Sequence, residues 1–461
     1  MKKFWLVLLS LGLVMAFSVS AFAVDVKVSG EYYAAGLYLN KTNVNDTSAK
    51  GTYDGLSTAF FYQRLRVGTD FVVSPCLKLV TRFDAMERIW GGARSPVDGG
   101  TTPATLAVDS AGTRAENENI AIDWVYINYV APIGTFDVGY MNSGATGTIF
   151  GNSAVPAGRI KYYSPLIKDA LNINADITKS TDKSYSAVTT SASATDTDKD
   201  AYAIEGVYNF KNNKATGKAA LKIAYSRDAT NRAITNGYKS TYFTFTPWAI
   251  AKIGPVALQA EVAWAVGDSK DFDQPTSSTD IKLDNLSAFI DATATFAPVY
   301  VGGTFAYVSG DDPGTSDKKE GGTLKGGNDW NPCLIMFNYY DTYNWVGAIS
   351  GYDGSVVYGG RSNAWFFQGR VGVKPTPQWD AMLSVSYATA DKKPGTPSTR
   401  YANGTYGTEI DLVGTYKITN NLSYMLGIGY LFTGDYFKGY DSSSYELVDD
   451  YILVNKLTLT F

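Results

Sequence analysis

The last eleven residues of the chain, 451–461, constrain its fold more than any other segment. Side chains of an extended strand point alternately to opposite faces. Counted back from the C-terminus, apolar or aromatic residues share one face with a single exception at Asn455: Phe461, Leu459, Leu457, Leu453 and Tyr451. The other face carries Thr460, Thr458 and Lys456. This division predicts the closing strand of a membrane barrel, with apolar side chains outward and polar ones inward.

The same alternation recurs upstream, where two consecutive predicted strands carry several basic residues on one face. Polar or charged side chains alternate with apolar ones at Tyr62, Arg64, Arg66 and Asp70 in 61–73, and at Lys78, Arg82, Asp84 and Arg88 in 77–89. An Arg or Lys that faces lipid at mid-depth costs about 2–4 kcal/mol. Aligned basic residues therefore predict a water-filled lumen on that side of the sheet.

Short turns and long polar loops alternate between the predicted strands. The turns are rich in Pro, Gly, Asn and Asp, which suit tight bends, and lie at 74–76, 131–134, 166–169, 210–217, 253–255, 297–298, 375–378 and 419–421. Eight turns and two free ends predict an all-β fold, a transmembrane antiparallel β-barrel of eighteen strands with short periplasmic turns and long extracellular loops. One misassigned hairpin would make the number sixteen.

The longest loop, 310–363, contains two apolar stretches, 333–337 and 344–349. A solvated loop does not need them, so we expect this loop to fold back into the mouth of the barrel. An additional hairpin is the competing interpretation. Asp311 and Asp312 at its start also suggest a calcium site at the outer rim, although charged loop tips are more often only solvated.

The N-terminus has the pattern of a secretory signal. Two lysines precede the apolar run 4–19, and Ala21-Phe22-Ala23 resembles a cleavage site. We expect residues 1–23 to be removed and 24–461 to form the barrel, located in the bacterial outer membrane. A retained membrane anchor is the alternative, but the apolar run is short for one.

Composition argues against enzymatic chemistry. The chain contains no histidine, which excludes His-based acid–base catalysis and imidazole metal sites. We expect no catalytic residues, no cofactor and no metal site. The net charge of −4 argues against a nucleic-acid partner. The two cysteines, Cys76 and Cys333, are expected at opposite ends of the barrel and therefore unpaired.

With its closing strand, signal segment and strand pattern, the chain resembles the Gram-negative outer-membrane porins, in which the last strand typically ends in Phe. The resemblance implies contacts with outer-membrane lipid and lipopolysaccharide, assembly as a homotrimer, and diffusion of small hydrophilic solutes and ions. A soluble β-propeller or sandwich would also have many short strands, but it has no need of an apolar outside and polar inside.

Charged residues on the predicted inner face are the candidates for a pore constriction: Arg64, Arg66, Arg82, Asp84, Arg88, Asp137, Arg159 and Lys161. In porins the third outer loop bends into the lumen, and 143–156 is third in order here. It lacks acidic residues, so the constriction would be net positive and favour anions or neutral solutes. The arginines could instead be structural, paired with nearby aspartates.

Aromatic residues were assigned to both faces. Trp124 and Trp248 are among those expected in the outer girdles. Lumenal aromatics would favour a second function, a substrate-specific channel for a sugar or organic anion, and are expected at Tyr33, Tyr62, Tyr129 and Tyr163. An outer-membrane enzyme or adhesin is a third hypothesis. The absence of histidine disfavours a hydrolase, but it does not argue against an adhesin.

Overall fold

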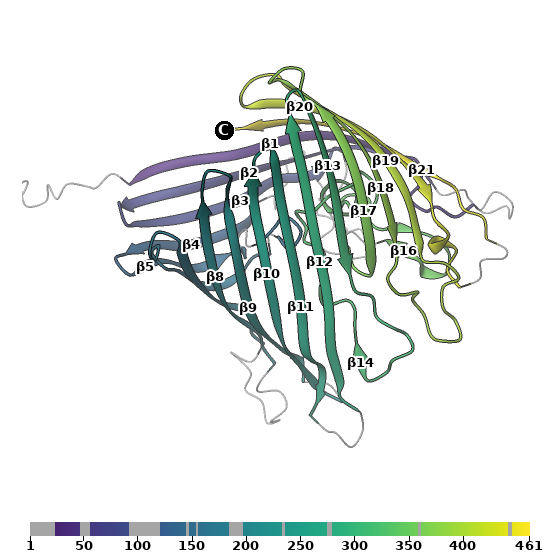
Figure 1. Ribbon diagram of the computed structural model, residues 1–461, viewed down its shortest axis with the longest axis horizontal. Coiled ribbons are helices and arrows are strands. Elements are labelled where there is room, and N and C mark those ends of the chain that lie inside the picture. The colour runs from purple at the N-terminus through teal and green to yellow at the C-terminus, as the bar shows by residue number, and fades with distance from the viewer. Residues whose placement is uncertain are drawn as a thin grey trace, which may run out of the picture.

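The computed structural model describes residues 24–46, 56–91, 120–143, 147–153, 155–183, 197–232, 236–273, 279–357, 361–440 and 445–461. The predicted signal segment lies outside these residues. The described chain forms one closed antiparallel barrel of eighteen strands (Figure 1), so the larger of the two predicted strand numbers is confirmed.

The barrel strands follow one another in sequence order around the sheet. They are β1 (Asp25–Leu39), β2 (Thr58–Ser74), β3 (Leu77–Ile89), β4 (Ile120–Ala131), β5 (Gly134–Met141), β6 (Ala157–Tyr163), β7 (Leu171–Thr181), β8 (Lys199–Lys211), β9 (Ala215–Asn231), β10 (Tyr238–Ile253), β11 (Val256–Phe272), β12 (Ile281–Phe296), β13 (Val299–Val308), β17 (Ala364–Val373), β18 (Trp379–Thr389), β19 (Thr405–Lys417), β20 (Leu422–Thr433) and β21 (Asp450–Thr460). All eight predicted short turns lie between consecutive strands.

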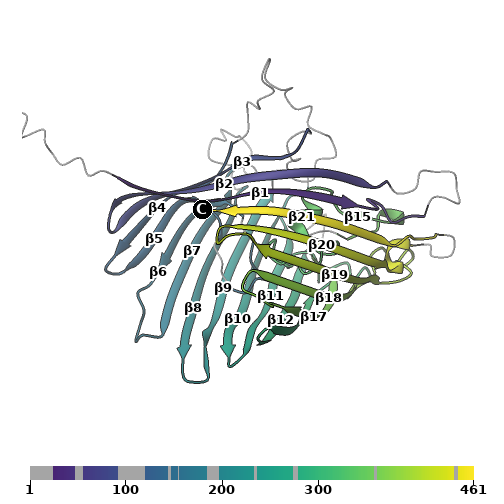
Figure 2. The ribbon, with the colours of Figure 1, turned by 90° about the horizontal axis from the view of Figure 1, so that it is seen from above.

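The C-terminal strand closes the barrel as its alternation predicted. β21 pairs with β1 from Glu31 opposite Thr460 to Leu39 opposite Ile452. The yellow last strand therefore lies beside the purple first strand in both ribbon views (Figures 1 and 2). The amide of Phe461 donates to the carbonyl of Gly30 at 3.0 Å, and the Gly30 amide donates back at 2.8 Å. These bonds leave no unpaired edge at the junction.

The outer face of β21 is apolar and exposed, whereas its inner face is buried. Leu453, Leu457 and Phe461 are 42%, 39% and 51% exposed. Ile452 and Val454 on the other face are 0% and 1% exposed. The buried core therefore lies inside the barrel. No helix in the described part of the chain is long and apolar enough to cross a membrane.

Residues of the loop 310–363 pack inside the barrel. The loop contains the short strands β14 (Lys318–Lys319), β15 (Ile349–Ser350) and β16 (Val356–Val357), a π-helix η3 (Tyr339–Tyr343) and a 3-10 turn η4 (Tyr352–Gly354). Its apolar side chains pack against inward residues of the wall: Trp330, Leu334, Ile335, Met336 and Phe337 against Phe366, Tyr406, Ile452 and Val454. The loop thus folds into the barrel, and its described residues add no further hairpin to the barrel wall, because β15 and β16 pair only with each other.

A β-bulge in β3 reverses the alternation near its end. The register with β2 shifts between Gln63 and Leu65, and Met86 takes a φ of 54°. Glu87 consequently faces the lumen, 3.7 Å from Arg64. Arg88 lies directly opposite Gln63, and cross-strand partners share a face. Since Tyr62 is buried inward, Gln63 and Arg88 face outward, and the prediction that Arg88 lines the lumen is wrong.

A second bulge in β4 corrects two aromatic assignments. The register with β3 shifts between Arg82 and Phe83, so Asp123 is an extra residue and Trp124 lies opposite Arg82. Trp124 therefore turns inward, where its ring stacks 3.6 Å from the Arg82 guanidinium. Tyr129 turns outward and is 45% exposed. Both predictions were wrong because the alternation was continued through the bulge.

Trp248 on β10 is also lumenal. Its indole NH donates to Glu205 Oε1 at 2.9 Å, and the side chain is 9% exposed. Its cross-strand partner is Glu261, which is 5% exposed and faces inward. Trp248 is therefore not part of an outer aromatic girdle.

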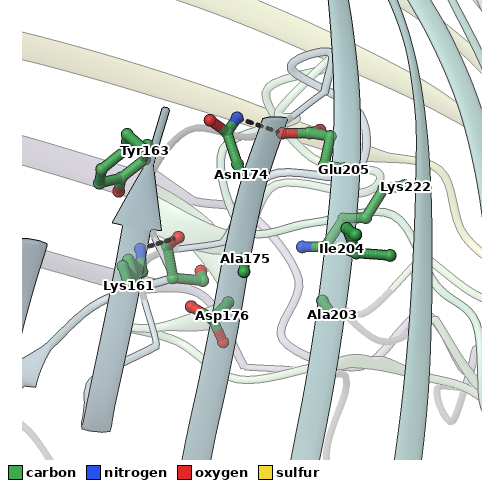
Figure 3. A pocket seen from close by; sticks show the side chains of 10 residues that line it. Lys161, Tyr163, Asn174, Ala175, Asp176, Ala203, Ile204, Glu205 and Lys222 are labelled. Carbon is green, nitrogen blue, oxygen red and sulfur yellow. Dashed lines mark hydrogen bonds between the residues drawn. The ribbon is translucent and has the colours of Figure 1, made fainter. Parts of the chain in front are cut away.

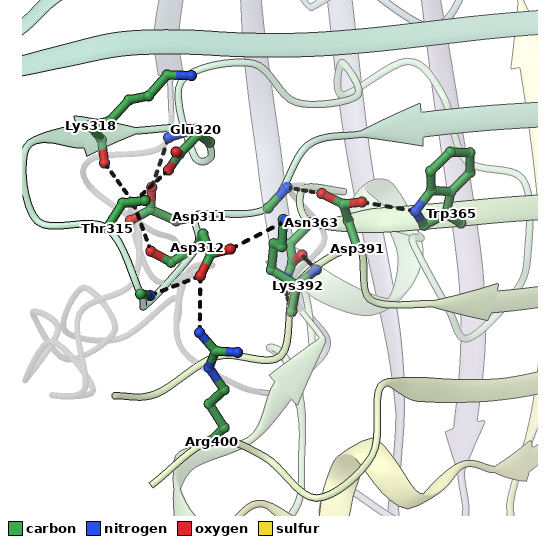
Figure 4. A network of polar contacts seen from close by, with 12 residues as sticks. Asp311, Asp312, Thr315, Lys318, Glu320, Asn363, Trp365, Asp391, Lys392 and Arg400 are labelled. Atoms are coloured by element: carbon green, nitrogen blue, oxygen red, sulfur yellow. Dashed lines mark hydrogen bonds and ion pairs between the residues drawn. The ribbon is translucent and has the colours of Figure 1, made fainter. Parts of the chain in front are cut away.

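Polar contacts anchor the start of the 310–363 loop to the loop after β18 (Figure 4). The Asp312 carboxylate accepts the Gly314 amide at 2.8 Å and lies 3.4 Å from Lys392 Nζ and 3.1 Å from Arg400 Nη2. Asp311 accepts the amide of Glu320 at 2.9 Å. The chain's own cations and amides thus engage both aspartates that suggested a calcium site.

We predict that Asp312→Asn loosens this anchor. The backbone hydrogen bond from Gly314, with the Lys392 charge, holds the pKa of Asp312 below its usual value. A lowered pKa means that the stabilisation is full at neutral pH and is lost as the pH falls through the lowered value. Hydrogen–deuterium exchange of the Gly314 amide, corrected for the intrinsic rate, should be severalfold faster in the variant at pH 7.

The matched control is Asp317→Asn, an exposed carboxylate in the same loop. It should leave exchange at Gly314 unchanged. Equal exchange in the wild type and Asp312→Asn at neutral pH would contradict the anchoring role.

Candidate pore constriction

Three strands of the wall, β2, β3 and β4, build a compact ionic network on their inner face. Arg66 makes a two-point contact with Asp84, with Nε–Oδ1 and Nη2–Oδ2 distances of 2.7 Å and 2.6 Å. Arg82 Nε donates to Asp123 Oδ2 at 3.0 Å, and Arg66 lies 3.6 Å from the same oxygen. Asp84 is 5% exposed. These opposite charges largely compensate one another, so Arg66 and Arg82 stabilise the barrel wall.

Arg64 is held less tightly than its neighbours. Its nearest carboxylates, Glu31 and Glu87, lie at 3.5 Å and 3.7 Å, and their side chains are 40% and 28% exposed. The guanidinium also lies 5.1 Å from the centre of the Tyr33 ring. Long contacts to solvated carboxylates leave Arg64 available to a passing solute.

The 310–363 loop brings an acid to this basic wall. Asp341, in η3, accepts the Tyr62 hydroxyl at 2.7 Å and lies 2.5 Å from Lys456 Nζ on β21. Asn338 caps the same turn by accepting the amide of Asp341 at 2.9 Å. Asp341 therefore links the loop to β2 and β21 at once, and it opposes the positive charge of the wall.

A neighbouring tyrosine of the loop is kept neutral. Tyr340 donates its hydroxyl to Asp329 Oδ1 at 2.6 Å. Burial, reinforced by the Asp329 carboxylate, raises the pKa of Tyr340. The ring thus faces the lumen as an uncharged aromatic surface with its hydroxyl already engaged.

A cavity of about 350 Å³ lies between the loop and the wall. Its lining is Glu31, Tyr33, Arg64, Arg66, Asn331, Tyr340, Asp341, Lys456 and Thr458. Three cationic and two anionic side chains face it, with two tyrosines. We define these nine residues as the constriction cavity. Its size fits a small organic solute.

A second group of charged residues, which includes Lys161, Asp176, Glu205 and Lys222, lies on β6 to β9 (Figure 3). Arg159 lies 3.5 Å from Asp176 and also contacts Thr178. Lys161 donates to the carbonyl of Ser143. The cavity around Lys161, Asp176 and Glu205 measures about 40 Å³, which is room for about one water molecule. These contacts tie the wall to Ser143, at the start of the 143–156 segment.

Residues 147–153 of the predicted inward loop do lie inside the barrel. Thr148 donates its amide and hydroxyl to Glu261 Oε2, both at 2.9 Å. A Cβ at Gly151 would come within 2.2 Å of Glu261 Oε1, so a larger residue there would require the Glu261 side chain to move. Phe150 is 1% exposed and stacks on Phe289 at 4.9 Å.

Seven of the eight candidate residues face the lumen, but they form two groups. Arg64, Arg66, Arg82 and Asp84 share the β2–β4 network, whereas Arg159 and Lys161 belong to the second group, and Asp137 accepts Asn128 Nδ2 at 2.6 Å nearby. Of the predicted lumenal tyrosines, Tyr33, Tyr62 and Tyr163 lie inside. Asn331, Tyr340 and Asp341 could not be predicted as site residues, because no pattern in a long loop indicates which residues will meet the wall.

Comparison with solved structures agrees with the fold. OccK9 (OpdG) of Pseudomonas aeruginosa is 12% identical, with a TM-score of 0.51 over 95% of this chain and 100% of that chain. OpdQ of Pseudomonas aeruginosa is 13% identical, with a TM-score of 0.50 over 96% of this chain and 100% of that chain. The chain thus has the fold of the outer-membrane porins. No family model matches the chain, and no curated protein does.

We predict that Asp341→Asn increases the preference of the pore for anions. The change removes the negative charge beside Lys456 but keeps a group that can accept from Tyr62. In planar bilayers with a salt gradient, the reversal potential should move toward the anion equilibrium potential.

Asp353→Asn is the control, because Asp353 lies in the same loop and its side chain is exposed. It should leave the reversal potential at the wild-type value. A shift of equal size in both variants would mean that Asp341 has no special place in the ion path.

Proposed function

We propose that the chain is an outer-membrane channel through which small hydrophilic solutes and ions diffuse, with a net basic constriction. The observation that carries this proposal is the division of the barrel wall. Ionised residues such as Arg64 and Lys456 face inward, while apolar residues such as Leu453 and Leu457 are exposed outside. A solvent-filled lumen inside an apolar belt is the arrangement of a membrane pore.

Several further features belong to the same proposal. Residues 1–23 would be a cleaved export signal that leads the chain to the outer membrane. There the apolar belt would contact lipid and lipopolysaccharide. As in the porins that this chain resembles, three copies would assemble as a homotrimer. No catalytic role is proposed for any residue.

The constriction cavity would set the ion preference. Arg66, Arg82, Asp84 and Asp123 neutralise one another within the wall, so they contribute little net field. Arg64 and Lys456 then face two carboxylates in the cavity, Glu31 and Asp341. The side chain of Glu31 is 40% exposed, whereas those of Arg64 and Lys456 are 13% and 21% exposed, so solvent screens this acid more than it screens the two cations. Because the lumen wall has a low dielectric constant, an excess positive charge there attracts anions into the path.

We predict that the double substitution Arg64→Gln and Lys456→Gln moves the reversal potential toward cations in bilayer recordings. Both side chains are partly solvated, at 13% and 21% exposure, so the barrel should still fold. Lys282→Gln at the outer rim, whose side chain is 67% exposed, should have no such effect. Unchanged selectivity in the double variant would refute the basic constriction.

A substrate-specific channel for an organic anion is the second candidate. It is favoured by Tyr33, Tyr340 and Arg64, which share a cavity of about 350 Å³, since these groups can stack on a planar solute and pair with its carboxylate. A general diffusion pore needs no such combination.

We predict for this candidate that an aromatic carboxylate reduces the single-channel current in a saturable way. Arg64→Gln should raise the half-blocking concentration about tenfold, the loss of one charge-assisted contact. Lys282→Gln serves again as the control. A current that falls linearly with the carboxylate concentration, without saturation, would favour the general pore.

A further inference from the structure

A buried cluster of ionisable groups lies where the 310–363 loop meets the wall, outside the constriction cavity. Cys333 of the loop and Glu409 and Asp411 of β19 each offer one ligand atom, and the three atoms lie within 4.8 Å of one another. Their exposed fractions are 3%, 0% and 1%. The proposed conduction does not require these groups.

The polar groups of this cluster are poorly satisfied. Neither carboxylate oxygen of Asp411 makes a hydrogen bond of ordinary geometry within the described residues, although the Glu409 carboxylate, the Leu334 amide and the Ser384 hydroxyl lie near it. Ser384 lies directly opposite Asp411 on β18 and is 1% exposed, and its Oγ makes no hydrogen bond of ordinary geometry either. Buried polar groups are normally well satisfied, so these neighbouring exceptions point to a ligand between them.

The cluster also lacks a counter-charge. No Lys or Arg of the described residues forms an ion pair with Glu409 or Asp411. Glu409 does accept the amides of Ile335 and Met336 at 2.6 Å and 2.7 Å. These bonds hold Glu409 in place but supply no full positive charge. Buried charges are ordinarily paired or coordinate a metal.

We propose that Cys333, Glu409 and Asp411 bind a Zn²⁺ ion. Calcium and magnesium take oxygen ligands almost exclusively, whereas a thiolate selects a softer cation. Zinc accepts sulfur and carboxylate ligands in tetrahedral geometry, and the Ser384 hydroxyl or a water molecule would take the fourth position. On binding, the Cys333 thiol releases its proton to solvent as the zinc–sulfur bond forms.

The ion would fasten the inserted loop to the wall. Cys333 lies in the loop, and the two carboxylates lie on one strand of the barrel. A metal between them adds a link at the start of the apolar stretch 333–337, next to the hydrogen bonds that Glu409 makes. The loop that carries Tyr340 and Asp341 would then hold one position in the lumen.

The test uses the full chain, exported to the outer membrane and extracted in detergent. The protein is incubated with Zn²⁺, dialysed, and its metal content is measured by mass spectrometry. Wild type should retain about one zinc ion per chain. Cys76→Ser, which changes the exposed cysteine of the β2–β3 turn, should retain the same amount. Cys333→Ser and Asp411→Asn should lose it.

Replacement of zinc by Co²⁺ provides a second readout. A sulfur-to-cobalt charge-transfer absorption should be present in wild type and Cys76→Ser and absent in Cys333→Ser. If Asp411→Asn fails to form a barrel, Ser384→Ala, a smaller change, should still weaken retention severalfold. Wild-type protein that retains no zinc, or Cys333→Ser protein that retains as much as wild type, would overturn the proposal. If wild-type protein retains no zinc, protons alone neutralise the buried carboxylates of the cluster.

Discussion

The closed ring of strand-to-strand hydrogen bonds is the constraint on which the rest of the structure depends. The pairing of β21 with β1 leaves no sheet edge and creates two separate surfaces from one alternating sequence. Only then can Lys456 face Asp341 inside while Leu457, the next residue, is exposed outside. In an open sheet, either the inner charges would face lipid or the outer apolar row would face water.

Much of this barrel could be predicted, because its information is local. The alternation in 451–461, the eight short turns and the charged inner face each depend on neighbours within a few residues. The errors at Arg88, Trp124 and Tyr129 share a local cause, a β-bulge, whereas Trp248 lies in a regular part of β10. In β4 the extra residue Asp123 reverses the alternation. Trp124 therefore faces the lumen and Tyr129 faces outward, each opposite to its predicted side. In β3 the bulge falls at Met86, a residue type that gives no hint of a positive φ.

The contents of the lumen were predicted less well, because they depend on contacts between distant segments. The apolar stretch 333–337 correctly indicated an inserted loop. Nothing in the sequence, however, indicated that Asp341 would lie beside Lys456, 115 residues later. The same limit applies to the Cys333 cluster. The absence of histidine led to the expectation of no metal, but a thiolate and two carboxylates brought together by folding offer a ligand set that requires none.

The charged residues of the inner face differ in role according to how closely each charge is paired with an opposite one. Where a cation has a short two-point contact with a buried acid, as Arg66 has with Asp84, loss of one partner would leave the other buried and uncompensated. Such pairs must persist for the wall to hold, so they cannot serve a moving solute. Arg64 faces partly solvated acids across longer distances, and a solute anion can compete for it at low cost. Selectivity is therefore expected from the weakly paired charges beside the loop, whereas the tightly paired ones maintain the surface on which those charges are placed.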